Sequence, residues 1–168
     1  MSEQMPIREL GRYVELPLTE IDAYPVLAAC YRVWQAACAG DRLPASLDIG
    51  LVPAETLPYT MMLDYLPEAR DVRVRMAGLY VGEHSTFKDS GRGLRGFFNE
   101  TDAAIVYDSL VRIADAKQPS LARRDYVTID GNRHGYTRLI LPLAADGTTV
   151  SGFFKTVEPA SLKVEPAA

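Results

Sequence analysis

Three residue types that build chemical sites are scarce in this sequence, and long apolar runs are missing. The 168 residues include 2 cysteines, 2 histidines and 1 tryptophan. A metal site usually needs three or four convergent ligands. His84 and His134 stand in no metal-binding spacing, and the cysteines lie in another segment. We therefore expect no metal site, and we interpret both histidines as surface or structural residues, with His134 exposed after a turn.

Neither a membrane span nor a secretion signal is predicted. No stretch reaches the roughly 18 consecutive apolar residues that a spanning helix needs, and the start, Met1-Ser2-Glu3-Gln4, is not followed by an apolar core with a cleavage site. Cys30 and Cys38 fall eight positions apart in one expected helix, about 12 Å along its axis, which is too far for a disulfide with each other. Two buried thiols fit a reducing compartment. We expect a cytoplasmic protein, with Cys38 packed as a small apolar side chain.

Positive charge is not in excess. The formal net charge is −4, so the chain lacks the long-range field that draws proteins to phosphate backbones, and we expect no nucleic-acid partner. Arg123-Arg124 is interpreted as a solvated strand end, with an anionic ligand or an acidic partner as the alternative.

The glycines from Gly91 to Gly96 have the spacing of a dinucleotide-binding loop, with Arg92 and Arg95 between them. That mechanism requires a strand directly before the loop and a parallel βαβ unit, and the pattern here supplies neither. We interpret the segment as a glycine-rich turn before a short helix, with an anion contact as the alternative.

Length and composition fit one domain, because 48% of the residues are hydrophobic and 24% are charged. We place it at residues 19–158, between flexible segments at 1–18 and 159–168. Apolar residues at helical spacing predict helices over residues 22–39 and 101–117. Alternation and Asp-Gly turns predict strands over residues 59–66, 71–80, 122–129, 134–143 and 149–157. Residues 81–100 read as short helical pieces.

This order predicts an α+β fold with a five-stranded antiparallel sheet, helices packed on one face, and an N-terminal flanking helix. A long helix laid across such a sheet leaves room for a cavity beneath it. The residues expected to line it are Met76, Phe97, Tyr107, Leu110, Leu139 and Phe153. The alternative is that these side chains fill a solid core.

The order of elements and several short phrases resemble the PAS domain family, in particular a bacterial subfamily of small stand-alone PAS proteins. The resemblance covers residues 24–157. The phrases include Trp34 leading into Gly40-Asp41-Arg42-Leu43-Pro44-Ala45, then Val74-Arg75-Met76-Ala77-Gly78, and later Arg138-Leu139-Ile140-Leu141-Pro142-Leu143. The resemblance implies a small sensory or docking domain whose cavity holds flavin, haem, a chromophore, a metabolite or nothing.

Two signatures of cofactor-binding PAS domains are missing. Residues 81–100 contain no cysteine of the kind that reacts with flavin, and residues 101–117 contain no histidine for haem. The cofactor is therefore unknown. We expect no attached output domain, so that signalling acts in trans. The expected partners are an unknown small molecule, a signalling protein, or both.

Three functional hypotheses follow. The leading one is a PAS-type sensor that is not an enzyme. The second is a homodimeric interaction module with an interface around Tyr24, Tyr31 and Trp34, because aromatic residues favour interfaces. The third is a small enzyme of the steroid-isomerase kind, with Asp64 or Tyr107 as the acting group. Against an enzyme, no serine lies in a Gly-x-Ser-x-Gly elbow, and Asp64 and Asp71 are interpreted as turn residues.

Overall fold

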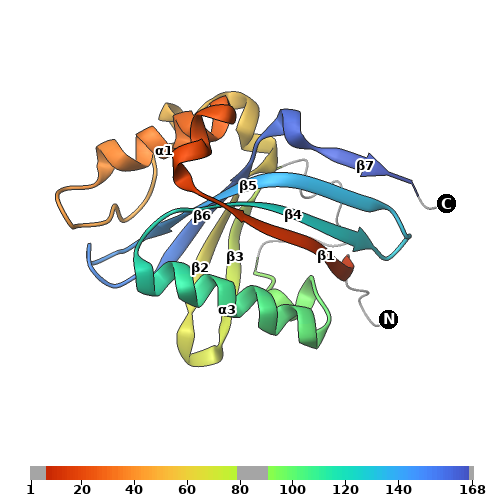
Figure 1. The fold of residues 1–168 in the computed structure, drawn as a ribbon. Helices are drawn as coiled ribbons and strands as arrows, with labels where there is room; N and C mark the ends of the chain where they lie inside the picture. Colours follow the sequence, from red (N-terminus) through yellow and green to blue (C-terminus); the bar gives the residue numbers. More distant parts are fainter. Residues whose placement is uncertain (1–6, 79–90, 167–168) are drawn as a thin grey trace.

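Seven antiparallel strands form one sheet in the computed structural model, which describes residues 7–78 and 91–166 (Figure 1). The strand order is β1-β4-β5-β6-β2-β3, and β7 pairs with the first residues of β5. The predicted α+β class with an antiparallel sheet is therefore confirmed. The strands are β1 (Ile7–Leu16), β2 (Met61–Leu66), β3 (Asp71–Ala77), β4 (Ser120–Thr128), β5 (Arg133–Leu143), β6 (Gly152–Val157) and β7 (Lys163–Glu165).

The sheet has two strands more than the five expected, and both lie in segments predicted to be flexible. β1 pairs with β4 along its whole length, and β7 pairs with residues Arg133–Gly135 of β5. The pairing of β1 shifts register twice, between Ile7 and Glu9 and between Leu10 and Tyr13. Such irregularities break the period-two alternation by which a strand is recognised in sequence. This is why β1 was missed.

Two α-helices were expected near these positions, and their ends differ from the prediction. α1 covers Pro25–Ala37 and α3 covers Glu100–Ala116. The N-cap of α3 is Asn99, whose side-chain oxygen accepts from the amide of Asp102 at 2.8 Å. Lys117 ends this helix in the left-handed region, at φ 54°.

The first turn of α1 is bound by a carboxylate that is distant in the sequence. Glu158, which follows β6, accepts from the amides of Leu27 at 3.0 Å and Val26 at 3.4 Å. Its side chain is buried with the helix end. The negative charge faces the positive end of the helix dipole, which stabilises the docking of α1 on the sheet.

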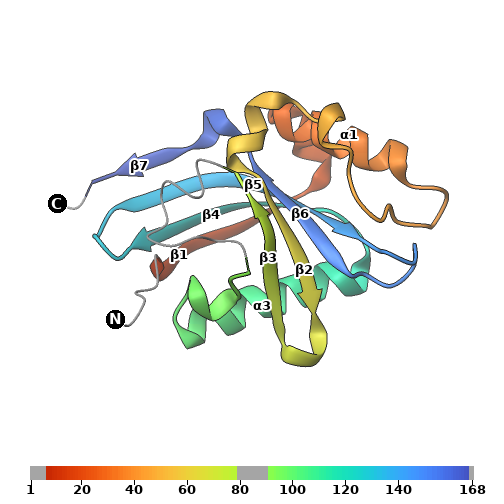
Figure 2. The same ribbon diagram turned by 180° about the vertical axis from the view of Figure 1, so that it is seen from behind.

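The helices cover opposite faces of the sheet. Alternation along β6 shows this, since Thr156 contacts Thr56 of the 3-10 helix Ala54–Tyr59 on the α1 side, whereas Lys155 and Val157 point to the α3 side. α1 and α3 lie on either side of β4, β5 and β6 in Figure 1, and Figure 2 shows the same separation from behind. Of the two α-helices in the described residues, α3 therefore covers the face that bears the cavity described below. Further 3-10 helices span Leu18–Ala23, Ile49–Leu51, Pro67–Ala69, Leu94–Gly96 and Pro159–Ser161.

Candidate functional site

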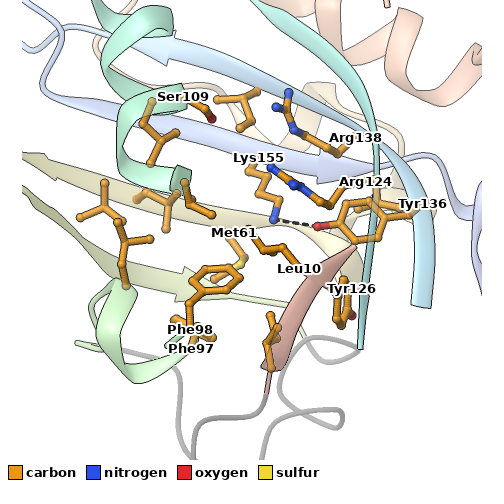
Figure 3. Close-up of a pocket in the computed structure, with 18 of the residues that line it drawn as sticks. Leu10, Met61, Phe97, Phe98, Ser109, Arg124, Tyr126, Tyr136, Arg138 and Lys155 are labelled. Carbon is orange, nitrogen blue, oxygen red and sulfur yellow. Dashed lines mark hydrogen bonds between the residues drawn. The ribbon is translucent and has the colours of Figure 1, made fainter. Parts of the chain in front are cut away.

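A cavity of about 180 Å³ lies between α3 and the sheet. Both α3 and every strand from β1 to β6 contribute to its wall (Figure 3). β1 closes one side with Ile7 and Leu10. The amide of Leu10 donates to the carboxylate of Asp102 at 2.9 Å, and the amide of Ile7 donates to the carbonyl of Phe97 at 3.1 Å. The strand missed in the sequence is thus bound to α3 and to the segment before it at the cavity wall.

One part of the wall is apolar. It is formed by branched aliphatic side chains from β2, β3, α3 and the 3-10 helix Leu94–Gly96, most of them buried. No hydrogen-bonding group is offered by these side chains, so this part favours a hydrocarbon body. The residues are Leu63, Val72, Val74, Leu94, Val106 and Leu110.

The other part of the wall carries positive charge. Arg124 of β4, Arg138 of β5 and Lys155 of β6 line the cavity from adjacent strands, and Figure 3 shows their nitrogen atoms gathered on one side. We call these residues the cation cluster. No aspartate or glutamate is among the described residues that line the cavity. A protein with a net negative charge therefore holds a positive site in its interior.

Arg138 is the most deeply buried member of the cation cluster, at 4% exposure. Its Nη1 donates to the carbonyl and hydroxyl oxygens of Ser120 at 2.9 and 2.8 Å, and its Nη2 donates to the phenol oxygen of Tyr13 at 3.1 Å. Burial, with repulsion from Arg124 as a smaller cause, holds the pKa of this guanidinium below its usual value, against the opposing effect of Tyr13. None of these three acceptors is a carboxylate oxygen.

Lys155 and Tyr136 form a pair inside the cavity. The ammonium Nζ donates to the phenol oxygen at 3.3 Å and lies 5.4 Å from the ring centroid. Burial raises the pKa of Tyr136, but the charges of Lys155, Arg138 and Arg124 favour the phenolate more strongly, so its pKa lies below the ordinary value. The phenol therefore reports the positive potential of the site.

The structure brings two of the six expected pocket residues to the cavity, Phe97 and Leu110. Tyr107 and Phe153 are instead packed around Tyr65, with ring centroids 6.3 and 5.3 Å from it. Met76 is partly buried in β3 but is not among the residues that line the cavity. Leu139 lies between Arg138 and Ile140, which line the cavity, so it points to the opposite face of β5.

The error at Leu139 has a physical origin, because β5 is buried on both faces. In such a strand, the alternation of apolar and polar residues does not show which side chains point toward the cavity. Leu139 was expected to line the cavity, but Arg138 and Ile140 line it and Leu139 points to the other face. Arg124 was likewise interpreted as solvated, yet it points into the cavity, while Arg123 pairs with Asp125 at 3.9 Å. The Arg123-Arg124 pair was the feature of the sequence that could have indicated a positively charged site, through the alternative of an anionic ligand.

Of the aromatic residues proposed as an interface, Trp34 belongs to the core, and Tyr24 and Tyr31 pack against it. Trp34 is 6% exposed, and its indole nitrogen donates to the carbonyl of Pro142 at 2.8 Å. Tyr31 stacks on Trp34 with centroids 6.2 Å apart, and Tyr24 is partly buried against the same core. Trp34 therefore stabilises the contact between α1 and β5 and is not available to a partner in this fold.

The segment that resembles a dinucleotide loop extends the edge of the sheet. The amide of Gly91 donates to the carbonyl of Val74, and the amide of Val74 donates to the carbonyl of Arg92. Asp71 then accepts from the amide of Leu94 at 2.8 Å. A side chain at Gly93 would meet the Asp71 carboxylate at 2.4 Å, which explains the glycine. The 3-10 helix Leu94–Gly96 follows, which agrees with the short helix expected after the glycine-rich turn.

The remaining polar candidates have structural contacts. Asp64 pairs with Arg75 at 2.5 Å on the surface, and the hydroxyl of Tyr107 donates to the carbonyl of Pro67 at 3.4 Å. Neither group lines the cavity, so the residues considered for an enzyme are not at this site. His134 is buried and stacked on Tyr126 at 4.9 Å, which corrects the expected exposure.

Both thiols are free, and Cys30 is buried in α1. Its burial, with a smaller effect of Glu158, raises the pKa of the Cys30 thiol to about 12, so it is a poor nucleophile. Within residues 7–78 and 91–166, no group of histidine, cysteine, aspartate or glutamate side chains could hold a metal ion. His84, Ser85 and Ser90 lie outside the described residues.

Comparison with models of protein families, with curated proteins and with solved structures gave no match to this chain. No helix in the described part of the chain has the length and apolar character of a membrane span.

Proposed function

We propose that this chain is a PAS-type sensory module that binds a small ligand in the cavity under α3 and acts in trans on a partner. The observation that carries the proposal is the cavity itself, which α3 and six strands enclose with an apolar part and a charged part. A core that served only stability would place few charged side chains there. The succession of β2 and β3, then α3, then the meander β4-β5-β6 is the order on which the PAS resemblance rests.

Strand β1 connects the cavity to the surface that a partner would bind. This edge strand supplies Ile7 and Leu10 to the cavity wall and Tyr13 to the hydrogen bond with Arg138. A ligand that binds better when β1 is docked would shift the population toward that state. The exposed side of the strand would then present a different surface to a partner. We also keep the cytoplasmic location and the homodimer as proposals, and the two free thiols fit the former.

Native mass spectrometry of the freshly purified protein tests the proposal, together with a variant in which the cavity is filled. Val106→Trp adds volume inside the cavity, whereas Ile105→Trp adds the same kind of side chain at the neighbouring position, which is 48% exposed. We expect extra mass on the wild type and on Ile105→Trp that is lost on denaturation, and none on Val106→Trp. The same spectra give the number of chains in the particle. Equal retained mass on both variants would place the ligand elsewhere and contradict the proposal.

A further inference from the structure

Within residues 7–78 and 91–166, no carboxylate pairs with the cation cluster. Among the described residues, Arg124, Arg138 and Lys155 take part in no ion pair, and Arg138 and Lys155 donate to hydroxyl and carbonyl oxygens of Ser120, Tyr13 and Tyr136. Tyr13, which accepts from Arg138, donates in turn to the exposed carboxylate of Glu15 at 3.1 Å. Gathering positive charges in a partly desolvated cavity costs free energy unless an anion joins them.

Arg124 is arranged to receive such an anion. Its guanidinium carbon lies 4.3 Å from the centroid of the Tyr13 ring, which occupies one face of the group. Within the described part of the chain, its side chain donates no hydrogen bond. The N–H groups at the edge of the guanidinium plane are therefore available, and their geometry matches the two oxygens of a carboxylate.

The size and the apolar wall of the cavity limit the part of the ligand that is attached to the anionic group. Its volume, about 180 Å³, is close to that of a cavity of about 150 Å³ that holds benzene in another protein. A nucleotide or a sugar phosphate would leave hydroxyls against the aliphatic side chains of Leu63, Val74 and Leu110. The space fits a ring or a short branched chain.

We propose that the ligand is a small carboxylate with a compact apolar body, such as an aromatic acid or a short-chain aliphatic acid. The carboxylate is bound by Arg124 and Lys155, with Arg138 behind them, and the apolar body lies under α3 against Val106 and Leu110. This inference rests on the proposed function and names the chemical class that the cavity binds.

Isothermal titration calorimetry with matched probes tests the class. Benzoate is compared with benzyl alcohol, hexanoate with hexan-1-ol, and inorganic phosphate is added as an anion without an apolar body. We expect each carboxylate to bind about tenfold to hundredfold more tightly than its alcohol, because hydrogen bonds to charged groups are the stronger ones. Phosphate alone is expected to bind more weakly than either carboxylate.

Variants assign the preference to the cation cluster. Arg124→Gln and Lys155→Met each remove one charge from the cavity, while Arg73→Gln removes one from the exposed side of β3, where it serves as the control. We expect the two cavity variants to lose about tenfold or more in benzoate affinity and the control to keep it. The ligand-free cavity variants should melt no lower than the wild type, because they relieve repulsion between like charges. A purely structural role would lower the melting temperature instead.

The outcomes separate this inference from the proposed function. If the alcohols bind as tightly as the acids, the cavity binds ligands but the carboxylate class is wrong. If neither acid binds the wild type, or if both cavity variants keep full affinity, the inference is overturned. The proposed function fails separately, when Val106→Trp does not change the mass retained in the native spectrum.

Discussion

Arg138, in the middle of β5, donates a hydrogen bond to the phenol oxygen of Tyr13 in β1 at 3.1 Å. The two strands are not neighbours, because β4 lies between them in the sheet. The contact therefore spans one strand and connects the cation cluster to the edge of the sheet. It gives the cavity a direct link to the strand that we propose as the output.

Replacing Tyr13 by phenylalanine keeps the ring and removes this acceptor. The ring contacts of Arg124 and Arg138 remain possible, at 4.3 and 5.7 Å in the wild type. We expect a loss of about 1–3 kcal/mol in unfolding free energy, because a buried guanidinium N–H is left without its partner. Urea denaturation measures the loss. Hydrogen exchange should become faster at the amides of β1 and stay unchanged in α1, and equal effects in both would contradict the link.

The ionisation of Tyr136 should depend on Lys155. The ammonium is the strongest of the charges that lower the pKa of this phenol, after the opposing effect of burial. Lys155→Met should therefore raise the pKa of Tyr136 above its value in the wild type, so that the phenolate forms at higher pH. Absorbance near 295 nm during a pH titration reports phenolate, and subtraction of a Tyr136→Phe titration isolates this residue. An unchanged titration in Lys155→Met would mean that the two groups are not in contact in solution.

Trp34→Ala should destabilise the fold and not only an assembly. The substitution removes a nearly buried indole and its hydrogen bond to Pro142. We expect a loss of about 3–5 kcal/mol, as for other large aromatic residues replaced by alanine in a core. Tyr31→Ala is the comparison, since Tyr31 is only partly buried and should cost less. A Trp34→Ala protein of full thermal stability with an altered particle size would support the interface interpretation instead.

Glu158→Gln should weaken the docking of α1. The glutamine keeps an acceptor oxygen for the amide of Leu27 but loses the charge at the start of the helix. We expect a loss of about 1–2 kcal/mol, in the range found for partly buried charges at helix ends. Glu165→Gln is the matched control, because Glu165 is exposed in β7. Equal denaturation midpoints for both variants would show that the buried charge does not stabilise α1.

The regular elements could be predicted from periodicity, whereas the cavity could not. The stripe of α3 and the alternation of Val72, Arg73 and Val74 gave the right elements because each has one wet side and one buried side. In β5 both sides are buried, so the sequence pattern does not indicate which side chains point toward the cavity. The charged residues of the cation cluster point inward, against the rule that places charge outside.

β1 shows a second limit of sequence reading. Its inward residues Ile7, Leu10 and Tyr13 are three positions apart, since bulges interrupt the pairing with β4. Inward residues that recur every three positions, with charged residues between them, do not show the two-residue alternation that predicts a strand. β7 is too short to carry a pattern, with only Lys163–Glu165 in the ladder. Both strands depend on pairing with strands distant in the sequence, which no local pattern reveals.

The most direct test of the central claim is an NMR titration of the ¹⁵N-labelled protein with benzoate. We expect the largest amide shifts at Arg124, Arg138, Lys155 and Leu110, which surround the cavity on four elements, and no shift at Leu27 in α1 on the far face. Shifts confined to the surface, or an unchanged spectrum at millimolar benzoate, would contradict the account.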